Sequence, residues 1–206
     1  GEAVRLAETE RSGAVHLELP EDIANEICNT SPVTPKEIIY QKANNKIIDE
    51  ALKEIEKSKH PLVVLGGGVN RNSISKELNT FFKKTGIPFV STQMGKGAMD
   101  ENSPLYIGTT ALSGGEYVHQ ALKHADVIVM IGHDVIEKPP IILTPESFPN
   151  CKIIHINYFS STATDIYIPT HEIIGDISST LSIFAKKIKI NLDWNFDYFF
   201  EIQNKF

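Results

Sequence analysis

Cysteine is scarce in this chain of 206 residues, which contains only Cys28 and Cys151. The two cysteines lie far apart and lack the close spacing of zinc ligands, so the sequence favours reduced thiols and a cytoplasmic protein. Basic residues are also in deficit, since 20 lysines and arginines against 26 acidic residues leave a net charge of −6. That charge argues against a nucleic-acid or anionic-membrane partner. No apolar run approaches the roughly 20 residues of a membrane span.

The common catalytic signatures are missing as well. The sequence contains no G-x-S-x-G nucleophile elbow, P-loop, kinase signature or His/Cys metal set. His119 and His124 lie about one turn apart in a predicted helix, but no third ligand with suitable spacing accompanies them. His155 lies within an apolar strand, where we expect a hydrogen-bonded core histidine. Function must therefore be sought in the fold and in the loops that it positions.

What the sequence does contain is an alternation of strands and helices from Asn44 to about Lys187. Short strands without polar alternation are typical of a parallel sheet that is covered on both faces. Their alternation with helices predicts a doubly wound α/β domain of the Rossmann-like type, mostly parallel, with about six strands. The expected helices are 44–59, 73–84, 117–124 and 177–188, and the expected strands are 61–65, 87–91, 126–131, 152–157 and 171–174.

The segments that flank this array, residues 44–188, have a different character. Residues 1–30 hold a short amphipathic stretch, a glycine turn and one apolar strand, Ala14–Leu19. A lone strand cannot pair both its edges, so we expect these residues to be the C-terminal tail of an upstream domain. Residues 31–43 hold two prolines and are predicted to be a linker. The aromatic-rich residues 189–206 are predicted to be a second linker, which packs against a following domain.

Glycine-rich or polar segments follow the predicted strands. Ligands bind at the carboxyl ends of the strands in open parallel sheets, so these segments are the candidate site. Glycines at 66–68 would allow a tight turn, close approach of the backbone to a ligand and an anion at the helix start. A simple strand-to-helix turn explains them equally well. His133 and Asp134 could contact a ligand or cap a turn. The segments are 66–68, 92–97, 108–115, 132–134, 157–158 and 175–176.

The order of these segments resembles the central domain of acetolactate synthases and related thiamine-diphosphate carboligases and decarboxylases. In that family a GGG turn precedes TxMGxGxxxxxHPLxxGxxGxxG, ADxxxxxGxRxDD, xxHIDID and GD. This chain reads TQMGKGAMDENSPLYIGTTALSGGEYV, ADVIVMIGHDVIEKP, KIIHINYF and IIGD. The opening, GEAVRLAETERSGAVHLELPED, resembles the end of the family's pyrimidine-binding domain, which reads RPGPVxIDLPxDV. The resemblance covers roughly residues 1–26 and 61–188.

The resemblance implies a larger parent enzyme that decarboxylates a 2-oxo acid, with pyruvate favoured, and transfers the two-carbon unit to a second 2-oxo acid. Thiamine diphosphate and Mg²⁺ would be held by the other domains of the parent chain. One of those domains carries a glutamate that activates the cofactor ring, and the other carries a GDG…N motif. Neither feature is present here, so we expect this chain to be inactive alone. The parent would be a homo-oligomer, a dimer or a tetramer.

Flavin-using members of the family hold FAD in this domain, and the resemblance implies where FAD would lie. Two departures weaken that implication, because Asp134 replaces the Arg of GxRxDD and Asn157 and Phe159 replace the aspartates of HIDID. FAD, another adenine nucleotide and an empty site all stay open, and Asp134→Arg would tighten FAD if the side chain faced the cofactor. The implied cofactor-binding residues are Gly67, Gly68, Thr92, Gln93, Met94, Gly108, Thr109, Leu112, Ser113, Gly114, Gly132, Asp134, Asn157 and Asp176.

Two rival interpretations belong to other functional classes. A sirtuin-type NAD-dependent deacylase has a related topology, but its usual zinc module needs two CxxC pairs, which the two isolated cysteines cannot supply. A structural or oligomerisation domain without a ligand, from another thiamine-diphosphate decarboxylase, is the second rival. A visible-light spectrum of the purified protein would separate this rival from a flavin binder.

Overall fold

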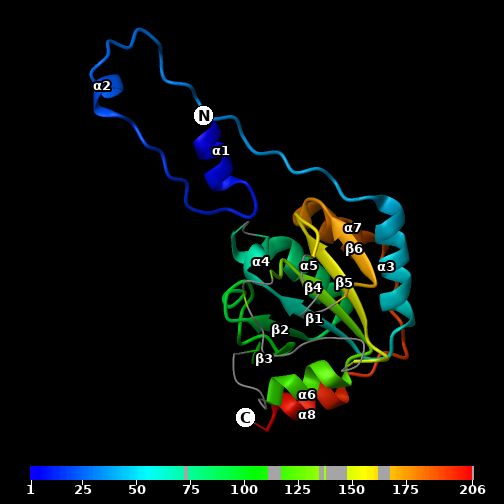
Figure 1. The fold of residues 1–206 in the computed structure, drawn as a ribbon. Helices are drawn as coiled ribbons and strands as arrows, with labels where there is room; N and C mark the ends of the chain where they lie inside the picture. Colours follow the sequence, from blue (N-terminus) through cyan, green and yellow to red (C-terminus); the bar gives the residue numbers. More distant parts are fainter. Residues whose placement is uncertain (72–73, 111–116, 135–136, 138–147, 162–167, 206) are drawn as a thin grey trace. The chain divides into compact units, whose positions relative to one another are not determined.

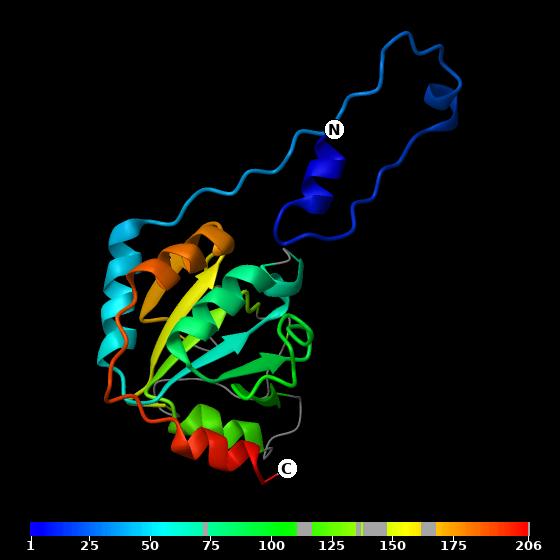
Figure 2. The ribbon, with the colours of Figure 1, turned by 180° about the vertical axis from the view of Figure 1, so that it is seen from behind.

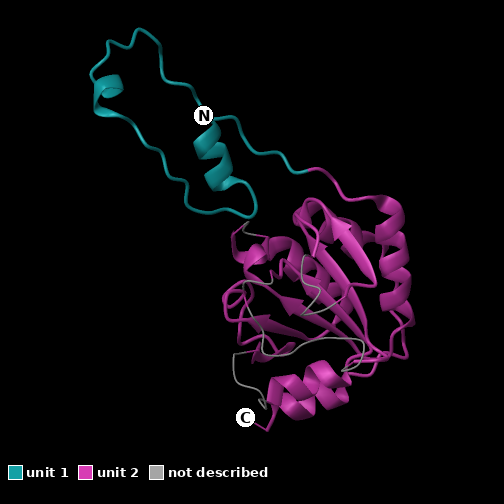
Figure 3. Ribbon diagram, in the orientation of Figure 1, with its two compact units in different colours: residues 1–40 teal, residues 41–206 magenta. Residues whose placement is uncertain are grey.

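The computed structural model describes residues 1–206 except 72–73, 111–116, 135–136, 138–147, 162–167 and 206. The chain forms two compact units, residues 1–40 and 41–206 (Figure 3). The strands are β1 (Pro61–Leu65), β2 (Phe89–Thr92), β3 (Tyr106–Thr110), β4 (Val127–Ile131), β5 (Lys152–Asn157) and β6 (His171–Ile174). The helices are α1 (Glu2–Glu8), α2 (Glu21–Ala24), α3 (Asn45–Lys57), α4 (Gly67–Arg71), α5 (Ser75–Thr85), α6 (Tyr117–His124), α7 (Ile177–Lys187) and α8 (Asp197–Gln203).

The first unit consists of the short helices α1 and α2 joined by irregular chain, and neither helix has a buried residue. The strand predicted over Ala14–Leu19 does not form, and that prediction was wrong. Leu17 is 77% exposed and Leu19 is 67% exposed. The physical reason is that this part of the chain, as described, offers no partner strand for the ladder hydrogen bonds that an extended segment needs.

The second unit is built on a six-stranded sheet in the order β3-β2-β1-β4-β5-β6 (Figure 1). Every neighbouring pair of strands is parallel. This order is that of the doubly wound dinucleotide-binding fold, and the direction of winding reverses between β1 and β4. The predicted fold class is therefore confirmed.

Two apolar cores cover the two faces of the sheet. Alternate residues of each central strand point to opposite faces, so Val63 and Leu65 join one core while Leu62 and Val64 join the other. The first core is closed by α3, α4, α5 and α7, and the second by α6 and α8. The second view, from behind, shows α6 and α8 packed side by side, as in the first view (Figure 2).

Most predicted elements are confirmed, but β3 and α8 were missed. The prediction placed Gly108 and Thr109 in a loop, whereas both lie in the edge strand β3. The C-terminal segment was expected to pack against another domain. In the structure α8 packs on α6 and β3, and its Phe199 and Ile202 are buried in the second core. The expected contact with a following domain stays a prediction.

No helix within the described part of the chain has the length and apolar character that crossing a membrane requires.

Candidate functional site

The site predicted from the sequence lies where the winding of the sheet reverses, at the carboxyl ends of β1 and β4. The turns that follow these strands are joined directly by backbone hydrogen bonds. Gly66 N–H donates to the carbonyl of Ile131 at 2.9 Å, and Gly68 N–H donates to the carbonyl of Gly132 at 2.8 Å. Gly132 N–H in turn donates to the carbonyl of Ile156 on β5, at 2.9 Å. The two turns thus form one continuous hydrogen-bonded edge.

The glycines of these turns are required by contacts within the chain. A Cβ atom on Gly66 would lie 2.4 Å from the Cα of His133, and one on Gly68 would lie 2.9 Å from the Cα of Gly132. Gly95, in the loop after β2, is packed even more closely, since its Cβ would lie 2.0 Å from the carbonyl oxygen of Leu65. Close approach of backbone to backbone therefore accounts for these three glycines.

A carboxylate that the sequence analysis did not single out, Glu137, lies at the centre of this edge. Its Oε1 accepts hydrogen bonds from Gly67 N–H at 2.9 Å and from Asp134 N–H at 3.0 Å. Its Oε2 accepts a hydrogen bond from the hydroxyl of Thr92. Burial raises the pKa of Glu137, while these hydrogen bonds and the charge of Arg71 oppose that effect. The signal available in the sequence was an acidic residue three positions beyond Asp134, after a buried strand.

The residues next to Glu137 are buried within the turn after β4. His133 is 1% exposed and Asp134 is 2% exposed. Burial, together with the nearby charge of His155, lowers the pKa of His133 to about 3, so its imidazole is neutral near pH 7. Of the two roles considered for this pair, the observed burial favours a part in the turn.

Asn157 and Asp176 serve the chain's own structure. Asn157 is fully buried, and its side-chain amide donates to the carbonyl of His133 at 2.8 Å while its Oδ1 accepts from Tyr158 N–H at 2.9 Å. Asp176 caps α7, because its Oδ1 accepts from Ser179 N–H at 2.6 Å. The expected contacts of both residues with ribose or adenine stay predictions.

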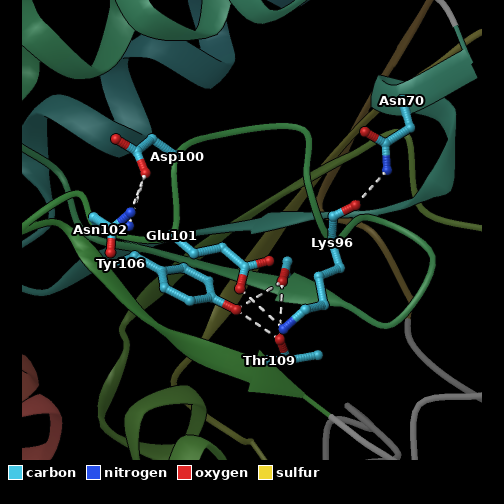
Figure 4. A network of polar contacts seen from close by, with 8 residues as sticks. Asn70, Lys96, Asp100, Glu101, Asn102, Tyr106 and Thr109 are labelled. Atoms are coloured by element: carbon cyan, nitrogen blue, oxygen red, sulfur yellow. Dashed lines mark hydrogen bonds and ion pairs between the residues drawn. The ribbon is translucent and has the colours of Figure 1, made fainter.

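A second polar cluster lies at the ends of β2 and β3 (Figure 4). The hydroxyl groups of Tyr106 and Thr109 lie 2.6 Å apart, and Ser91 Oγ lies 3.3 Å from Tyr106 Oη. Beside these hydroxyl groups Lys96 Nζ pairs with Glu101 Oε2 at 2.9 Å, and this contact raises the pKa of Lys96. Sequence reasoning missed this cluster because it did not place Tyr106 in a strand beside Ser91.

The predicted site residues therefore divide into groups. Gly67, Thr92 and Asp134 meet at Glu137, and a Cβ on Gly67 would lie 3.1 Å from that of Met94. Gly108 faces α6, since a Cβ there would lie 2.7 Å from the hydroxyl of Tyr117. Gln93 and Met94 are exposed. Leu112, Ser113 and Gly114 lie outside the described residues.

The arrangement does not fit a dinucleotide pyrophosphate at the first strand-to-helix turn. In this fold the pyrophosphate is held by backbone donors of that turn. Here Gly67 N–H already donates to Glu137, and the open side of Gly68 is filled by Gly132. In the part of the chain that the structure describes, no group of three or more His, Cys, Asp or Glu could hold a metal ion.

The chain is similar to a family of thiamine pyrophosphate enzymes. A family model described as the thiamine pyrophosphate enzyme central domain matches residues 48–183. The acetolactate synthase large subunit of Lactococcus lactis is 29% identical over 199 residues, which are 94% of this chain and 34% of that protein. Acetolactate synthase of Bacillus subtilis is 30% identical over 185 residues, 87% of this chain and 32% of that protein. The chain thus spans about a third of the length of these relatives.

A solved structure shares the fold. A putative thiamin diphosphate-dependent enzyme isolated from Mycobacterium smegmatis superposes with a TM-score of 0.65 at 22% identity. The match covers 80% of this chain and 32% of that one. At this level of identity the similarity supports the architecture of the sheet and its helices.

Proposed function

The chain belongs to the central-domain family of thiamine pyrophosphate enzymes, and we propose that it is the central domain of a larger enzyme similar to acetolactate synthase. The observation that carries the proposal is the family match over residues 48–183, which falls within the six-stranded unit. The acetolactate synthases that it resembles are about three times as long as the matched region. Such a length leaves room for two further domains.

The parent enzyme would decarboxylate a 2-oxo acid, with pyruvate favoured, and join the two-carbon unit to a second 2-oxo acid. Thiamine diphosphate would supply the carbanion chemistry of such reactions in the parent, and Mg²⁺ would hold its diphosphate. We assign both to the other domains, because this chain has neither the activating glutamate nor the GDG…N motif of the family. The chain alone is therefore proposed to be inactive.

The role of this domain in the parent is architectural. Its sheet is covered on both faces, and its C-terminal aromatic residues close the second core from within the same unit. We propose that residues 1–30 are the end of an upstream pyrimidine-binding domain and that residues 31–43 link it to the α/β domain. The chain beyond α8 would lead to a diphosphate-binding domain. The parent is proposed to be a cytoplasmic dimer or tetramer.

The alternative is a ligand-free structural domain of a different thiamine-diphosphate decarboxylase. The two candidates differ in the product of the parent, since carboligation of pyruvate gives acetolactate whereas simple decarboxylation gives acetaldehyde. Glu137 is buried among the backbone donors at the carboxyl ends of β1 and β4. For both candidate parents this favours a domain without a bound nucleotide.

The test compares the full-length parent protein with this chain in pyruvate, thiamine diphosphate and Mg²⁺. We expect acetolactate from the parent and no turnover above buffer from the chain alone. Omission of thiamine diphosphate from the parent is the matched control and should abolish the product. Pyruvate consumption by the chain alone would contradict the proposal, and acetaldehyde as the main product of the parent would select the alternative.

A further inference from the structure

We infer that Glu137 is an internal occupant of the nucleotide crevice, and that its carboxylate takes the place that a dinucleotide phosphate would need. The domain keeps the strand order of a dinucleotide-binding fold but closes the site with its own side chain. The inference rests on the contacts of Glu137 and on the strand order of the sheet, and it does not depend on the proposed acetolactate activity.

The donors that meet at Glu137 come from three different strand ends. Gly67 follows β1, Thr92 ends β2 and Asp134 follows β4, so three separate strand ends contribute one donor each. These strands are neighbours at the point where the winding reverses, which is where this fold binds phosphate groups. A carboxylate is the side-chain group closest in charge and acceptor capacity to a phosphate oxygen pair. Glu137 thus satisfies the donors that a phosphate would otherwise bind.

The space beside Gly67 is occupied by the chain itself. A Cβ added to Gly67 would lie 3.1 Å from the Cβ of Met94, 3.3 Å from Nη1 of Arg71 and 3.7 Å from Oε1 of Glu137. Gly66 and Gly68 face His133 and Gly132 at distances below 3.0 Å. A glycine-rich turn normally leaves backbone open to a ligand, but here each of the three glycines faces the chain itself.

The charge of Glu137 also opposes a nucleotide. A pyrophosphate at this edge would meet the carboxylate of Glu137, which already accepts from Gly67, Thr92 and Asp134. Like charges at close range oppose binding, most strongly where burial keeps water away. The charge of Arg71 acts on Glu137 and lowers its pKa, although burial, which raises the pKa, has the larger effect. A nucleotide could enter only by displacing Glu137.

The experiment measures binding of FAD, ADP and inorganic pyrophosphate to the wild-type chain and to Glu137→Ala, Glu137→Gln and Glu101→Gln. We expect no binding to wild type below millimolar concentration and at least a tenfold gain for all three ligands in Glu137→Ala. Glu137→Gln should gain less, because its amide oxygen still accepts from Gly67 and fills the same space. Glu101→Gln is the matched control, since it removes an acidic charge from the same sheet edge outside the Glu137 contacts. It should bind like wild type.

Two outcomes would overturn the inference. One is micromolar FAD binding by the wild-type chain, and the other is a folded Glu137→Ala variant with no gain for any ligand. If Glu137→Ala does not fold, the amide resonances of Gly67 and Asp134 decide the matter in the wild-type chain. Both should shift together as the Glu137 carboxylate titrates, and neither should do so in Glu137→Gln. Independent behaviour of the two amides would show that Glu137 does not bind there. Neither measurement depends on pyruvate turnover. A negative result would therefore contradict the role of Glu137 without bearing on the proposed function.

Discussion

The side-chain amide of Asn157 donates a hydrogen bond to the backbone carbonyl of His133 at 2.8 Å and so ties the end of β5 to the turn after β4. Asn157 is fully buried, and its oxygen also accepts from Tyr158 N–H. The turn that carries His133 and Asp134 is therefore held in place by a side chain that is buried away from solvent. This contact helps to fix the edge at which Glu137 lies.

Asn157→Ala should lower the free energy of unfolding by about 1–3 kcal/mol, because it leaves the buried carbonyl of His133 and the part-buried N–H of Tyr158 without their side-chain partner. Urea denaturation of the purified chain measures the change. Asn79→Ala is the matched control, since the Asn79 amide makes an exposed bond to the carbonyl of Ser75 on α5. The control should stay within about 0.5 kcal/mol of wild type. Equal losses in the two variants would refute the structural role of Asn157.

Gly66→Ala should destabilise the domain by about 3 kcal/mol, because its Cβ would lie 2.4 Å from the backbone of His133 and force two turns apart. Gly86→Ala provides the comparison. Gly86 ends α5 at φ +66° with open space around it, so alanine there meets only backbone strain of about 1–2 kcal/mol. Denaturation of both variants side by side separates steric overlap from strain. A Gly66→Ala variant as stable as Gly86→Ala would show that the turns can move apart freely.

The sequence predicted the sheet well because its central strands are mostly apolar and almost entirely buried. Segments such as Val127–Ile131 and Lys152–Asn157 carry apolar residues on both faces, which is typical of strands packed between two layers of helices. β3 was missed because Tyr106–Thr110 contains a glycine and two threonines and lies at the edge of the sheet. The helix α8 was missed because its aromatic residues suggested a linker that packs against a following domain.

The site was harder to predict than the fold, for a physical reason. The alternation of strands and helices and the glycine turns followed from local patterns. Of the predicted residues, Gly67, Thr92 and Asp134 meet at Glu137 in the structure. Which donor meets which acceptor depends on contacts between residues far apart in the chain. Glu137 and Gly67 are 70 positions apart, and no spacing rule connects them.

Stability should fall as the pH is lowered from about 6.5 to 5, because His133 must stay neutral in the folded chain. Its pKa is about 3 when folded, against 6.5 for an unperturbed histidine, so the unfolded chain binds more protons throughout this window. One such group gives a slope of about 1.4 kcal/mol per pH unit once the unfolded histidine is protonated. His155, whose pKa is also lowered by burial, adds to it. Urea denaturation at several pH values measures the slope.

His133→Gln should make that pH dependence shallower, since glutamine does not titrate. The contribution of His155 remains in this variant. The exposed His16 supplies a control, and His16→Gln should keep the wild-type slope. An unchanged slope in His133→Gln would show that His133 is not kept neutral by burial.

Asp134→Arg, considered on sequence grounds as a way to tighten FAD binding, should instead destabilise the chain. Asp134 is 2% exposed, so a longer guanidinium has no room in the turn. We expect a loss of about 2 kcal/mol or more and no gain in FAD affinity. Asp134→Asn, which keeps the size and the backbone N–H to Glu137, should be milder. Thermal unfolding with and without FAD tests both variants, and a stable Asp134→Arg chain with tenfold tighter FAD binding would contradict the expectation.

The central claim is that the catalytic cofactor of the parent enzyme is held outside this chain. Isothermal titration of the purified chain with thiamine diphosphate in the presence of Mg²⁺ tests the claim most directly, with the full-length parent titrated in parallel. We predict no binding heat from the chain and saturable binding by the parent. If the chain alone bound thiamine diphosphate saturably, with a dissociation constant similar to that of the parent, the claim would be contradicted.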